Sequence, residues 1–416
     1  MAIIKPFKAL RPVPELVSQV AALPYDVVTT REAAKIVKDN KYSFLYIDRP
    51  EIAFKEPINP YDSKVYEKAR EKLLDMIEKK IYIQDNKPCF YIYQLNRQNK
   101  IQKGIVACTS IDDYLNNVIK KHEHTLSEKE QDRVNHVNYT EAHTGPILMT
   151  YRENPDITAM IDEWSMTQPA IYNFQTDDNV TQTVWVIDND EVINKLMTLF
   201  TEVKAIYIAD GHHRTAAAVK VGIEKRSSNA NHTGFEGYNY FLSVIFPDTH
   251  LTILEYNRLI KNINGLSEEE LLERIKENFE MVCIGKEAFI PQNKHFFGMY
   301  MGGNWYGLKA KPKSFDVNNP VDSLDVSILH NLLIAPIFGI TDPRSDERID
   351  FVGGVKGVKE LERRVDSGEM RVAFVLYPTS IEDLMKISDS DCIMPPKSTW
   401  FEPKLQSGIF IHSMRD

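Results

Sequence analysis

The chain has 416 residues, of which 43% are hydrophobic and 26% charged, and its formal net charge is −9. This length exceeds what a single hydrophobic core comfortably serves, so two or three domains or one composite fold are expected. The composition is that of a globular protein and argues against disorder. The acidic balance argues against a general nucleic-acid binder, which carries a basic face or stripe.

The four cysteines stand singly, without the CxxC spacing of a zinc ribbon or a redox motif. Isolated cysteines are typical of buried, reduced thiols in a cytosolic protein. The first residues, 1–12, contain too short an apolar run for a signal peptide, and no later stretch reaches the roughly 18 apolar residues of a membrane span. We therefore expect a cytoplasmic protein that does not act at a membrane.

The N-terminal part predicts helices followed by a hairpin. A helix is expected to begin at Thr30, and helical apolar spacing predicts a longer helix over 61–79. Two β-like runs, 89–93 and 104–107, are joined by a polar loop over 96–103. Such a pair predicts a β-hairpin.

The middle of the chain predicts an α/β core, because strand-like and helix-like segments alternate there. Strands are expected over 146–151, 184–187 and 205–209, with a helix over 190–200. Further elements are expected in this order: a mobile surface loop over 222–237, strands over 240–246 and 251–256, a helix over 266–279, a hairpin over 296–308, helices over 324–338 and 358–365, and a strand over 371–376. The fold class predicted is a mixed α/β fold of three regions: an N-terminal α/β region over 1–150, a core over 151–262 and a C-terminal α+β region over 263–416.

The sequence Asp210-Gly211-His212-His213-Arg214-Thr215 lies between a buried strand and an alanine-rich helix. Gly211 lets a ligand approach the backbone, and the N–H groups of a helix start carry a partial positive charge that binds phosphate. Asp210 stands where an N-cap is expected and would bond the N–H of His212 or His213. The pattern predicts an anion-binding strand-to-helix turn; the alternative is a capped helix without a ligand.

Side chains in this turn divide between two directions. His212 and His213 differ by about 100° around the helix, so one should line the site while the other packs or braces it. Thr215 lies three residues after His212 and shares its face. Arg214 offers a planar fork for phosphate or carboxylate oxygens.

A second polar constellation is His122-Glu123-His124-Thr125. If this segment is a strand, both imidazoles project to one face and form a candidate metal pair. A third ligand would come from His136, His143 or Asp132. The alternatives are a solvated polar surface, or Glu123 acting as a general base.

Two further segments and several absences bear on function. Pro24-Tyr25-Asp26 places a carboxylate at a rigid turn, where it is a candidate functional group. The alternative is that Asp26 only forms an Asx turn before a helix. Lys397-Ser398-Thr399 would clamp an anion or merely end a loop. The sequence lacks a P-loop, the dinucleotide fingerprint, the protein-kinase catalytic set and a Gly-x-Ser-x-Gly elbow.

Many blocks of this sequence, over nearly its whole length, resemble a bacterial and archaeal group catalogued as DUF family 1015. These blocks, in chain order, are Pro24-Tyr25-Asp26-Val27-Val28, His122-Glu123-His124-Thr125, Asp132-Arg133, Asp210-Gly211-His212-His213-Arg214, Tyr256-Asn257-Arg258, Leu324-Asp325-Val326, Pro396-Lys397-Ser398-Thr399-Trp400-Phe401-Glu402-Pro403-Lys404 and Ser407-Gly408.

The Asp-Gly-His-His-Arg motif is also similar to that of free-serine kinases of the ParB/sulfiredoxin superfamily. The resemblance implies a ParB/sulfiredoxin-like nucleotide-binding core in which the helix start cradles nucleotide phosphates. It also implies a kinase that makes O-phospho-L-serine from L-serine with ATP or ADP and Mg²⁺. Carried over by position, the implied phosphate cradle is Gly211, His212, His213 and Arg214, and Thr215 is added to it. The catalytic carboxylate does not carry over by position, so Glu123, Asp26 and Asp210 are its candidates, in that order, with His213 as a further catalytic group. Residue type and motif membership, and not the resemblance, suggest a Mg²⁺ ligand at Asp210 and substrate-binding groups at Arg133, Lys397 and Ser398.

Two other classes of function stay open at this point. The first is a nucleotide-binding ParB-like regulator without phosphotransfer. The second is a metal-dependent hydrolase built on His122, His124 and a third ligand. For the kinase, we expect a small-molecule substrate, L-serine or a related hydroxyl compound, with no nucleic acid and no membrane as partner and with a homodimer left open.

Overall fold

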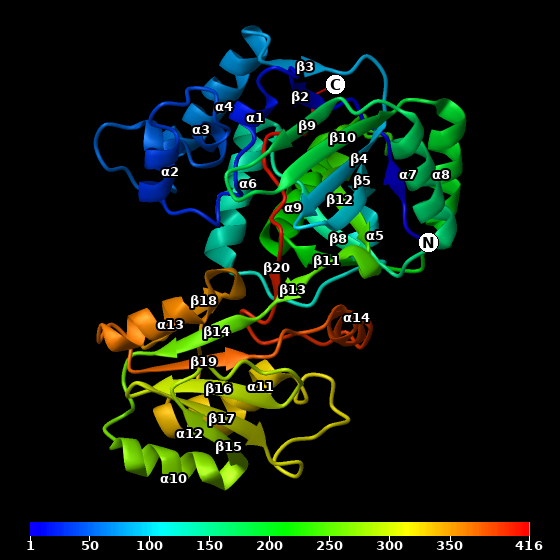
Figure 1. Ribbon diagram of the computed structural model, residues 1–416. Coiled ribbons are helices and arrows are strands. Elements are labelled where there is room, and N and C mark those ends of the chain that lie inside the picture. Colours follow the sequence, from blue (N-terminus) through cyan, green and yellow to red (C-terminus); the bar gives the residue numbers. More distant parts are fainter. Residues whose placement is uncertain (416) are drawn as a thin grey trace. The chain divides into compact units, whose positions relative to one another are not determined.

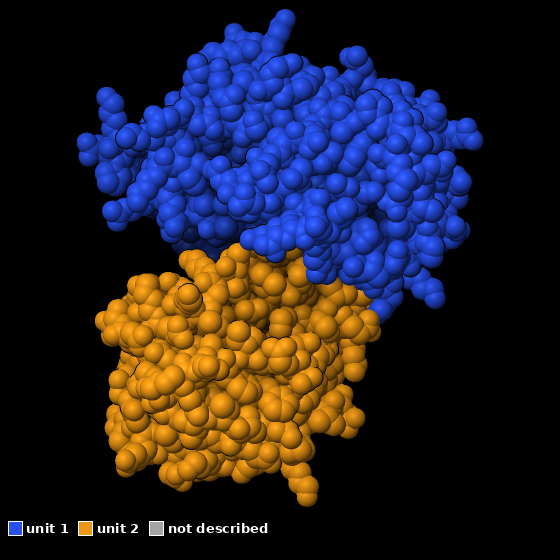
Figure 2. All heavy atoms as spheres, in the orientation of Figure 1, with its two compact units in different colours: residues 1–251, 403–416 blue, residues 252–402 orange. Residues whose placement is uncertain are grey.

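The computed structural model describes residues 1–415 and divides into two compact units (Figure 2). The first unit consists of residues 1–251 and 403–416, and the second of residues 252–402. These bounds differ from the three regions expected over 1–150, 151–262 and 263–416. The reason is that strands from the first two expected regions pair in one sheet, while residues near the end of the chain pair with residues 142–143 of the first region in a separate two-stranded sheet.

A nine-stranded mixed sheet forms the centre of the first unit (Figure 1). Its main path is β6-β11-β8-β12-β5-β4-β10-β9, and β1 pairs with β5. The pairs β11–β6 and β12–β8 are parallel, whereas the others are antiparallel. The strands are β1 (Ile4–Lys5), β4 (Phe90–Arg97), β5 (Lys100–Ser110), β6 (Ile119–Lys120), β8 (Ile147–Tyr151), β9 (Tyr172–Gln175), β10 (Thr181–Ile187), β11 (Ile206–Asp210) and β12 (Tyr240–Pro247). With helices packed on this sheet, the predicted mixed α/β class is confirmed.

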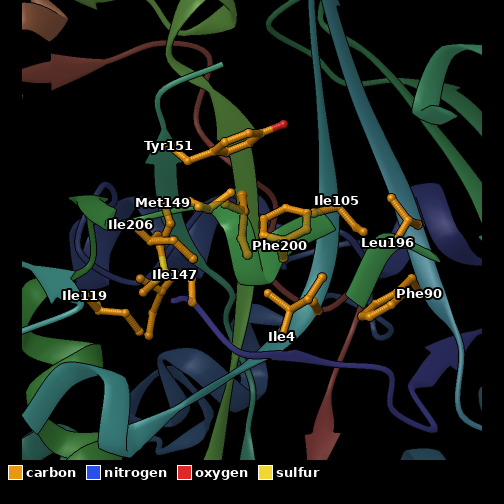
Figure 3. Close-up of a cluster of buried hydrophobic side chains, with 14 of the residues drawn as sticks. Ile4, Phe90, Ile105, Ile119, Ile147, Met149, Tyr151, Leu196, Phe200 and Ile206 are labelled. Carbon is orange, nitrogen blue, oxygen red and sulfur yellow. The ribbon is translucent and has the colours of Figure 1, made fainter. Parts of the chain in front are cut away.

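One face of this sheet carries a hydrophobic cluster (Figure 3). Side chains alternate between the faces of a strand, so Ile147, Met149 and Tyr151 of β8 point the same way. Helices α7 (Pro155–Thr167) and α8 (Asp190–Glu202) add their apolar residues to the cluster. Burying one large aliphatic side chain contributes about 1.5–3 kcal/mol, so this cluster is a main source of the sheet's stability.

The remaining helices and short strands of the first unit surround the sheet. α6 (Ser127–Thr140) packs against α9 (His212–Ser228) through a small cluster that includes Val137 and Val221. The other elements are β2 (Leu10–Pro12), α1 (Val17–Val20), α2 (Thr30–Ile36), α3 (Leu45–Asp48), α4 (Ser63–Glu78), β3 (Tyr82–Gln84), α5 (Ile111–Leu115), β7 (Ala142–His143) and β21 (His412–Ser413). The helices expected from Thr30 and over 61–79 are thus confirmed as α2 and α4.

The C-terminal segment, 403–416, is built into the first unit. The ring of Phe410 packs on Tyr91 and Tyr93, with centroid distances of 5.2 and 5.9 Å. Gly408 adopts a φ of +83°, and a Cβ at this position would lie 2.5 Å from Cγ of Phe44. Only glycine therefore lets the segment approach this closely.

The hairpin expected near residue 100 is present, but the loop predicted over 96–103 is wrong. The polar stretch 96–103 belongs mostly to the strands, which pair through to Arg97 and Lys100. Gln98 and Asn99 both have positive φ, 51° and 65°, as a two-residue hairpin turn requires. The longer loop was predicted from the polarity of this stretch. Polar residues also occur in strands, because a strand need not be buried on both of its faces.

The mobile loop expected over 222–237 is also partly wrong, because α9 continues to Ser228. The last turn of the helix is held by Arg226, whose Nη1 lies 2.6 Å from Oδ1 of Asp112. This long-range ion pair has no counterpart in the local pattern of Asn, Ser and Gly.

The second unit is built on a six-stranded antiparallel sheet, β15-β17-β16-β19-β14-β18. The strand expected over 251–256 is divided in two. β13 pairs with β20 in a two-stranded sheet, whereas β14 joins the six-stranded sheet. The elements are β13 (Ile253–Leu254), β14 (Tyr256–Ile260), α10 (Glu268–Asn278), β15 (Phe279–Gly285), β16 (Phe296–Met301), β17 (Asn304–Ala310), α11 (Asp325–Leu329), α12 (Ala335–Phe338), β18 (Ile349–Gly353), α13 (Gly357–Asp366), β19 (Val372–Leu376), α14 (Ile381–Asp389) and β20 (Trp400–Phe401). Across residues 1–415, none of the helices has both the length and the apolar character needed to cross a membrane.

Candidate functional site

The turn between β11 and α9 is made by Gly211, which has a φ of +104°. A Cβ at this position would lie 3.2 Å from Nε of Arg214, so glycine lets that guanidinium lie against the turn. The sequence placed the N-cap at Asp210, which is wrong: the N-cap is Gly211, and Asp210 ends β11. A glycine has no side chain to bond the first N–H groups of the helix, which keep their partial positive charge.

Asp210 is held by Lys404, which arrives from the C-terminal segment. The Lys404 Nζ donates to Oδ2 of Asp210 at 2.9 Å. Burial acts to raise the pKa of Asp210, but the charges of Lys404 and Arg214 outweigh it and hold this pKa well below its ordinary value. The carboxylate is therefore ionised at neutral pH, which makes it a weak proton acceptor but a suitable oxygen ligand for Mg²⁺.

Arg214, in the first turn of α9, reaches back to the start of β8. Its Nη1 donates to the carbonyl oxygen of Pro146 at 2.6 Å. A Cβ at the neighbouring Gly145 would lie 3.3 Å from both this Nη1 and Oγ of Ser407. The glycine thus leaves room around a guanidinium that has further N–H donors to offer.

A small pocket of about 30 Å³ lies beside Arg214. Its charged and polar lining residues are Tyr25, Asp48, Arg133, His136, His143, Thr144, Arg214 and Ser407. By this measure one water needs roughly 10–15 Å³, so the space suits a carboxylate, an ammonium or a single phosphoryl group and is too small for a nucleoside.

Arg133 supplies a second guanidinium to this pocket and is 8% exposed. Its Nη2 lies 2.7 Å from Oδ2 of Asp132, and its guanidinium carbon lies 3.9 Å from the ring centroid of Tyr25. Burial acts to lower the pKa of Arg133, but Tyr25, Asp132 and Asp48 more than compensate, so the pKa is raised. Arg133 therefore keeps its charge inside the protein.

Asp48 brings a carboxylate to the same pocket and is 4% exposed. The hydroxyl of Thr144 donates to its Oδ1 at 3.2 Å. Both signs of charge thus line one small space, with Arg133 and Arg214 opposed to Asp48. Such a set can bind a small zwitterion by pairing its carboxylate and its ammonium group.

A different group of side chains forms where His212 meets the segment 121–126. The rings of His122 and His212 are nearly perpendicular, with centroids 4.4 Å apart. The backbone N–H of His122 donates to Nε2 of His212 at 3.4 Å, and Nδ1 of His212 lies 3.8 Å from Oε2 of Glu123. Burial lowers the pKa of His122 to about 4 and holds the pKa of His212 well below its ordinary value, so both rings are neutral at pH 7.

The metal pair expected from His122 and His124 is wrong, because the segment 121–126 is not a strand. His122 is buried whereas His124 is exposed, and it is His212 that joins His122 and Glu123.

The three residues expected to complete that pair bond elsewhere. His136 Nε2 bonds the carbonyl oxygen of Ile47 at 2.9 Å, and the ring of His143 stacks on His412 at a centroid distance of 5.6 Å. Asp132 forms the ion pair with Arg133 described above.

His213 and Thr215, the remaining cradle candidates, take part in local bonds. The N–H of Leu126 donates to Nε2 of His213 at 3.0 Å, so this ring braces the segment 121–126. The hydroxyl of Thr215, which is fully buried, donates to the carbonyl oxygen of Gly211 at 3.1 Å. His212 packs against His122, which leaves Arg214 as the side chain of this turn that lines the pocket.

Three other candidates are not among the residues that line this pocket or form the histidine group. Asp26 is exposed and follows Tyr25 directly. Lys397 and Ser398 belong to the second unit. There, Nη2 of Arg258 donates to the carbonyl oxygen of Lys397 at 2.9 Å, and the hydroxyl of Ser398 donates to that of Pro395 at 2.6 Å.

A comparison with protein families agrees with the resemblance seen in the sequence blocks. The family model described as protein of unknown function, DUF1015, matches residues 4–327. The chain belongs to the DUF1015 family. A search among curated proteins found no match to the sequence of this DUF1015 protein.

Several solved structures are loosely similar to the DUF1015 chain. A free serine kinase in complex with AMP is 13% identical, covers 74% of this chain and 91% of its own, and has a TM-score of 0.34. A conserved hypothetical protein from Pyrococcus furiosus is 13% identical over 74% and 94%, with a TM-score of 0.35. SbnI from Staphylococcus aureus, with a C-terminal truncation, is 10% identical over 75% and 89%, with a TM-score of 0.39. At these TM-scores the likeness carries no argument about activity, and the ParB/sulfiredoxin-like core stays a prediction.

Sequence reasoning missed two charged residues of the site in this DUF1015 chain. Lys404 follows Asp210 by 194 positions, so nothing local announces their ion pair. Its place at the end of a quoted family block was the available signal. Asp48 stands in none of the quoted blocks, and an isolated aspartate in a helical stretch gives no sign of its burial.

Proposed function

We propose that this DUF1015 protein is a nucleotide-dependent small-molecule kinase that phosphorylates the hydroxyl group of an amino acid. Free L-serine is the first candidate substrate, and ATP or ADP is the donor. The observation that carries the proposal is the pocket in which Arg133, Arg214 and Asp48 meet beside the start of α9. Phosphoryl transfer needs positioned phosphates, compensated charge and an oriented hydroxyl, and it asks little covalent chemistry of the protein.

The donor phosphates are assigned to the helix start. Gly211, His212 and His213 would offer backbone N–H groups, as helix N-termini do for phosphate. Arg214 would add charge-assisted hydrogen bonds to the transferring phosphoryl group. The nucleoside would lie outside the pocket, since about 30 Å³ leaves no room for it.

The amino-acid head group is assigned to the pocket itself. Arg133 would pair with its carboxylate and Asp48 with its ammonium group, and these two side chains are almost fully buried. Ion pairs at buried positions are strong discriminators, because a substrate lacking one charge leaves its partner unpaired. Lys397 and Ser398 remain hypotheses for substrate binding that belong to the second unit.

In the chemical step, the hydroxyl oxygen of the amino acid forms a bond to the terminal phosphorus, and the bond to the leaving phosphate oxygen breaks. The products are the O-phospho amino acid and ADP from ATP, or AMP from ADP. The hydroxyl proton passes to a carboxylate, with Glu123 first, Asp26 second and Asp210 last. The low pKa of Asp210 argues against that last choice, and His213 stays a further candidate for proton transfer.

A magnesium ion, when bound with the nucleotide, supplies charge neutralisation for the phosphates. Asp210 fits the role of its ligand, because an ionised carboxylate is an oxygen donor of the kind that Mg²⁺ prefers.

The proposal is tested by incubating the full-length protein with Mg²⁺, L-serine and either ATP or ADP, and by following the products with phosphorus NMR. We expect a phosphoserine signal that is lost in Arg214→Ala and strongly reduced in Asp48→Asn. Lys225→Ala, which removes one positive charge from the far end of the same helix, serves as the control and should keep the signal.

A different pattern would favour the alternative function, a nucleotide-binding regulator. Protection of the protein against heat by ADP, with no phosphorylated product from L-serine or any other hydroxyl amino acid, would contradict the kinase. An intact signal in Arg214→Ala would remove this site from the reaction.

A further inference from the structure

One cluster of the first unit has the composition of a metal site. It includes Glu123, the first candidate for the proton acceptor, and a bound metal ion would pass that role to Asp26. His122, Glu123 and His212 each offer a ligand atom, and these atoms lie within 4.8 Å of one another. Two imidazoles and one carboxylate are a common ligand set for zinc and related ions, with water completing the coordination.

The state of His122 gives a second, independent indication. His122 is 2% exposed, and its Nδ1 has no hydrogen-bond partner among the described residues. The ring also makes a hydrogen bond to the backbone of Ile208 that raises its pKa, which means that the ring donates there, and with Nδ1 unpaired the donor is Nε2. A ligand histidine is typically fixed in this way, with one nitrogen bonded to a backbone carbonyl and the lone pair of the other directed at the metal.

The surroundings also favour a cation. Both imidazoles are buried, which favours the neutral form that binds metal. The negative charge of Asp210 acts on both rings, whereas Lys121 and His213 act on His212 in the opposite sense. The Glu123 side chain is 38% exposed, so the cluster has a side open to solvent.

We propose that His122, Glu123 and His212 bind a divalent transition-metal ion of the zinc class, through Nδ1 of His122, a carboxylate oxygen of Glu123 and a ring nitrogen of His212. Bond lengths of about 2.0–2.1 Å place the ligand atoms of a tetrahedral ion roughly 3.3 Å apart. Binding therefore draws these atoms together from their present separations, and the half-exposed Glu123 side chain makes most of the movement. Imidazole ligands disfavour Mg²⁺, so this site is distinct from the one assigned to Mg²⁺ at the phosphates.

The test is a titration of the full-length, untagged protein with Co²⁺, which reports its coordination by visible absorption, followed by competition with Zn²⁺. We expect one ion per chain, displaced by Zn²⁺ and not by excess Mg²⁺. His122→Gln, Glu123→Gln and His212→Gln should each weaken binding by at least about tenfold. His124→Gln, in the same segment and outside the cluster, is the matched control and should bind as the unaltered protein does.

Folding must be separated from binding, because His122 and His212 are buried. Glu123→Gln is the variant that keeps the test informative, since its side chain is partly exposed and the replacement has the same shape. Absence of Co²⁺ binding, unchanged affinity in Glu123→Gln, or a loss in His124→Gln equal to that in the ligand variants would overturn the proposal. Binding is measured without nucleotide or substrate, so its outcome does not depend on whether the protein is a kinase.

Discussion

The two sides of the α9 start differ in charge although they share one turn of helix. His212 and Arg214 are two residues apart, which places them about 200° apart around the helix. On the Arg214 side, Arg133, Arg214 and Asp48 line a pocket of charged groups. On the His212 side, burial has made His122 and His212 neutral. The same burial thus has opposite results, because an imidazole loses its proton readily whereas a guanidinium keeps its charge.

Because of this difference, we assign phosphate and carboxylate groups to the Arg214 side. We assign a metal ion that accepts nitrogen ligands to the His212 side. The pocket side also depends on the C-terminal segment, which delivers Lys404 to Asp210 and Ser407 to the pocket. Each of the following changes alters one side and leaves the other as the reference.

The largest effect is expected from Gly408→Ala, which prevents the C-terminal segment from docking. The new Cβ would lie 2.5 Å from the Phe44 ring, and φ is +83°. Backbone strain of about 1–2 kcal/mol and overpacking of about 1–3 kcal/mol should together lower the free energy of unfolding by roughly 2–5 kcal/mol. The control is Gly234→Ala, where φ is +92° but no atom lies within 4 Å of the added Cβ; equal losses in the two variants, measured by urea unfolding, would deny the close packing at Gly408.

Next in size is Arg133→Ala, which removes the proposed partner of the substrate carboxylate. A hydrogen bond to a charged group is worth about 1.5–3 kcal/mol, so the KM for L-serine should rise by roughly 10- to 150-fold. The affinity for nucleotide should change far less, because Arg214 and the helix start remain. A matched fall in nucleotide affinity would mean that the pocket does not separate the two ligands as proposed.

A smaller effect is expected from Lys404→Met, which removes the ammonium group that donates to the Asp210 carboxylate. The pKa of Asp210 is depressed in the folded protein, so the pair stabilises the fold above the unfolded pKa of an aspartate, and this stability is lost as the pH falls through the folded value. We expect a loss of about 1–2 kcal/mol at pH 7 that shrinks as the pH is lowered below about 4. The measurement is thermal unfolding of both proteins between pH 3 and 7. A loss of stability that does not depend on pH would mean that the substitution removes packing and not a charge interaction.

The smallest effect tests the independence of the two sides. His122→Gln should weaken Co²⁺ binding by at least about tenfold and weaken ADP binding far less, because the phosphates are assigned to backbone N–H groups of the helix start and the metal ion to side chains. Both affinities can be measured by calorimetry on one preparation. A comparable loss in both would merge the two sides into a single site.

The sequence predicted the parts of this arrangement that depend on residues close together in the chain. It missed the parts that depend on residues far apart in the chain. The buried strand, Gly211 and the alanine-rich helix are adjacent in sequence, so the strand-to-helix turn was predicted correctly. The N-cap was misplaced by one residue because Lys404, which is remote in sequence, holds the Asp210 carboxylate. The metal pair was misassigned for a similar reason, since His212 joins His122 from 90 positions away.

Pocket residues illustrate the same limit. The charge of Arg133 and its place in a family block made it a candidate. Its stacking on Tyr25 depends on the tertiary contact between α6 and the segment Pro24-Tyr25-Asp26, which the sequence did not indicate. Asp48 could not be found, because burial of a single aspartate leaves no periodic pattern. Local chemistry was therefore readable from the sequence, whereas side-chain contacts between residues 90 or more positions apart were not.

The central claim is that the start of α9, with Arg214, binds the phosphates of a nucleotide. The most direct measurement is calorimetric titration of the full-length protein with ADP and Mg²⁺, repeated for Arg214→Ala and for the control Lys225→Ala. We predict that the unaltered protein and Lys225→Ala bind ADP alike, and that Arg214→Ala binds roughly 10- to 150-fold more weakly. Equal binding by all three proteins, or no binding by the unaltered protein, would contradict the claim.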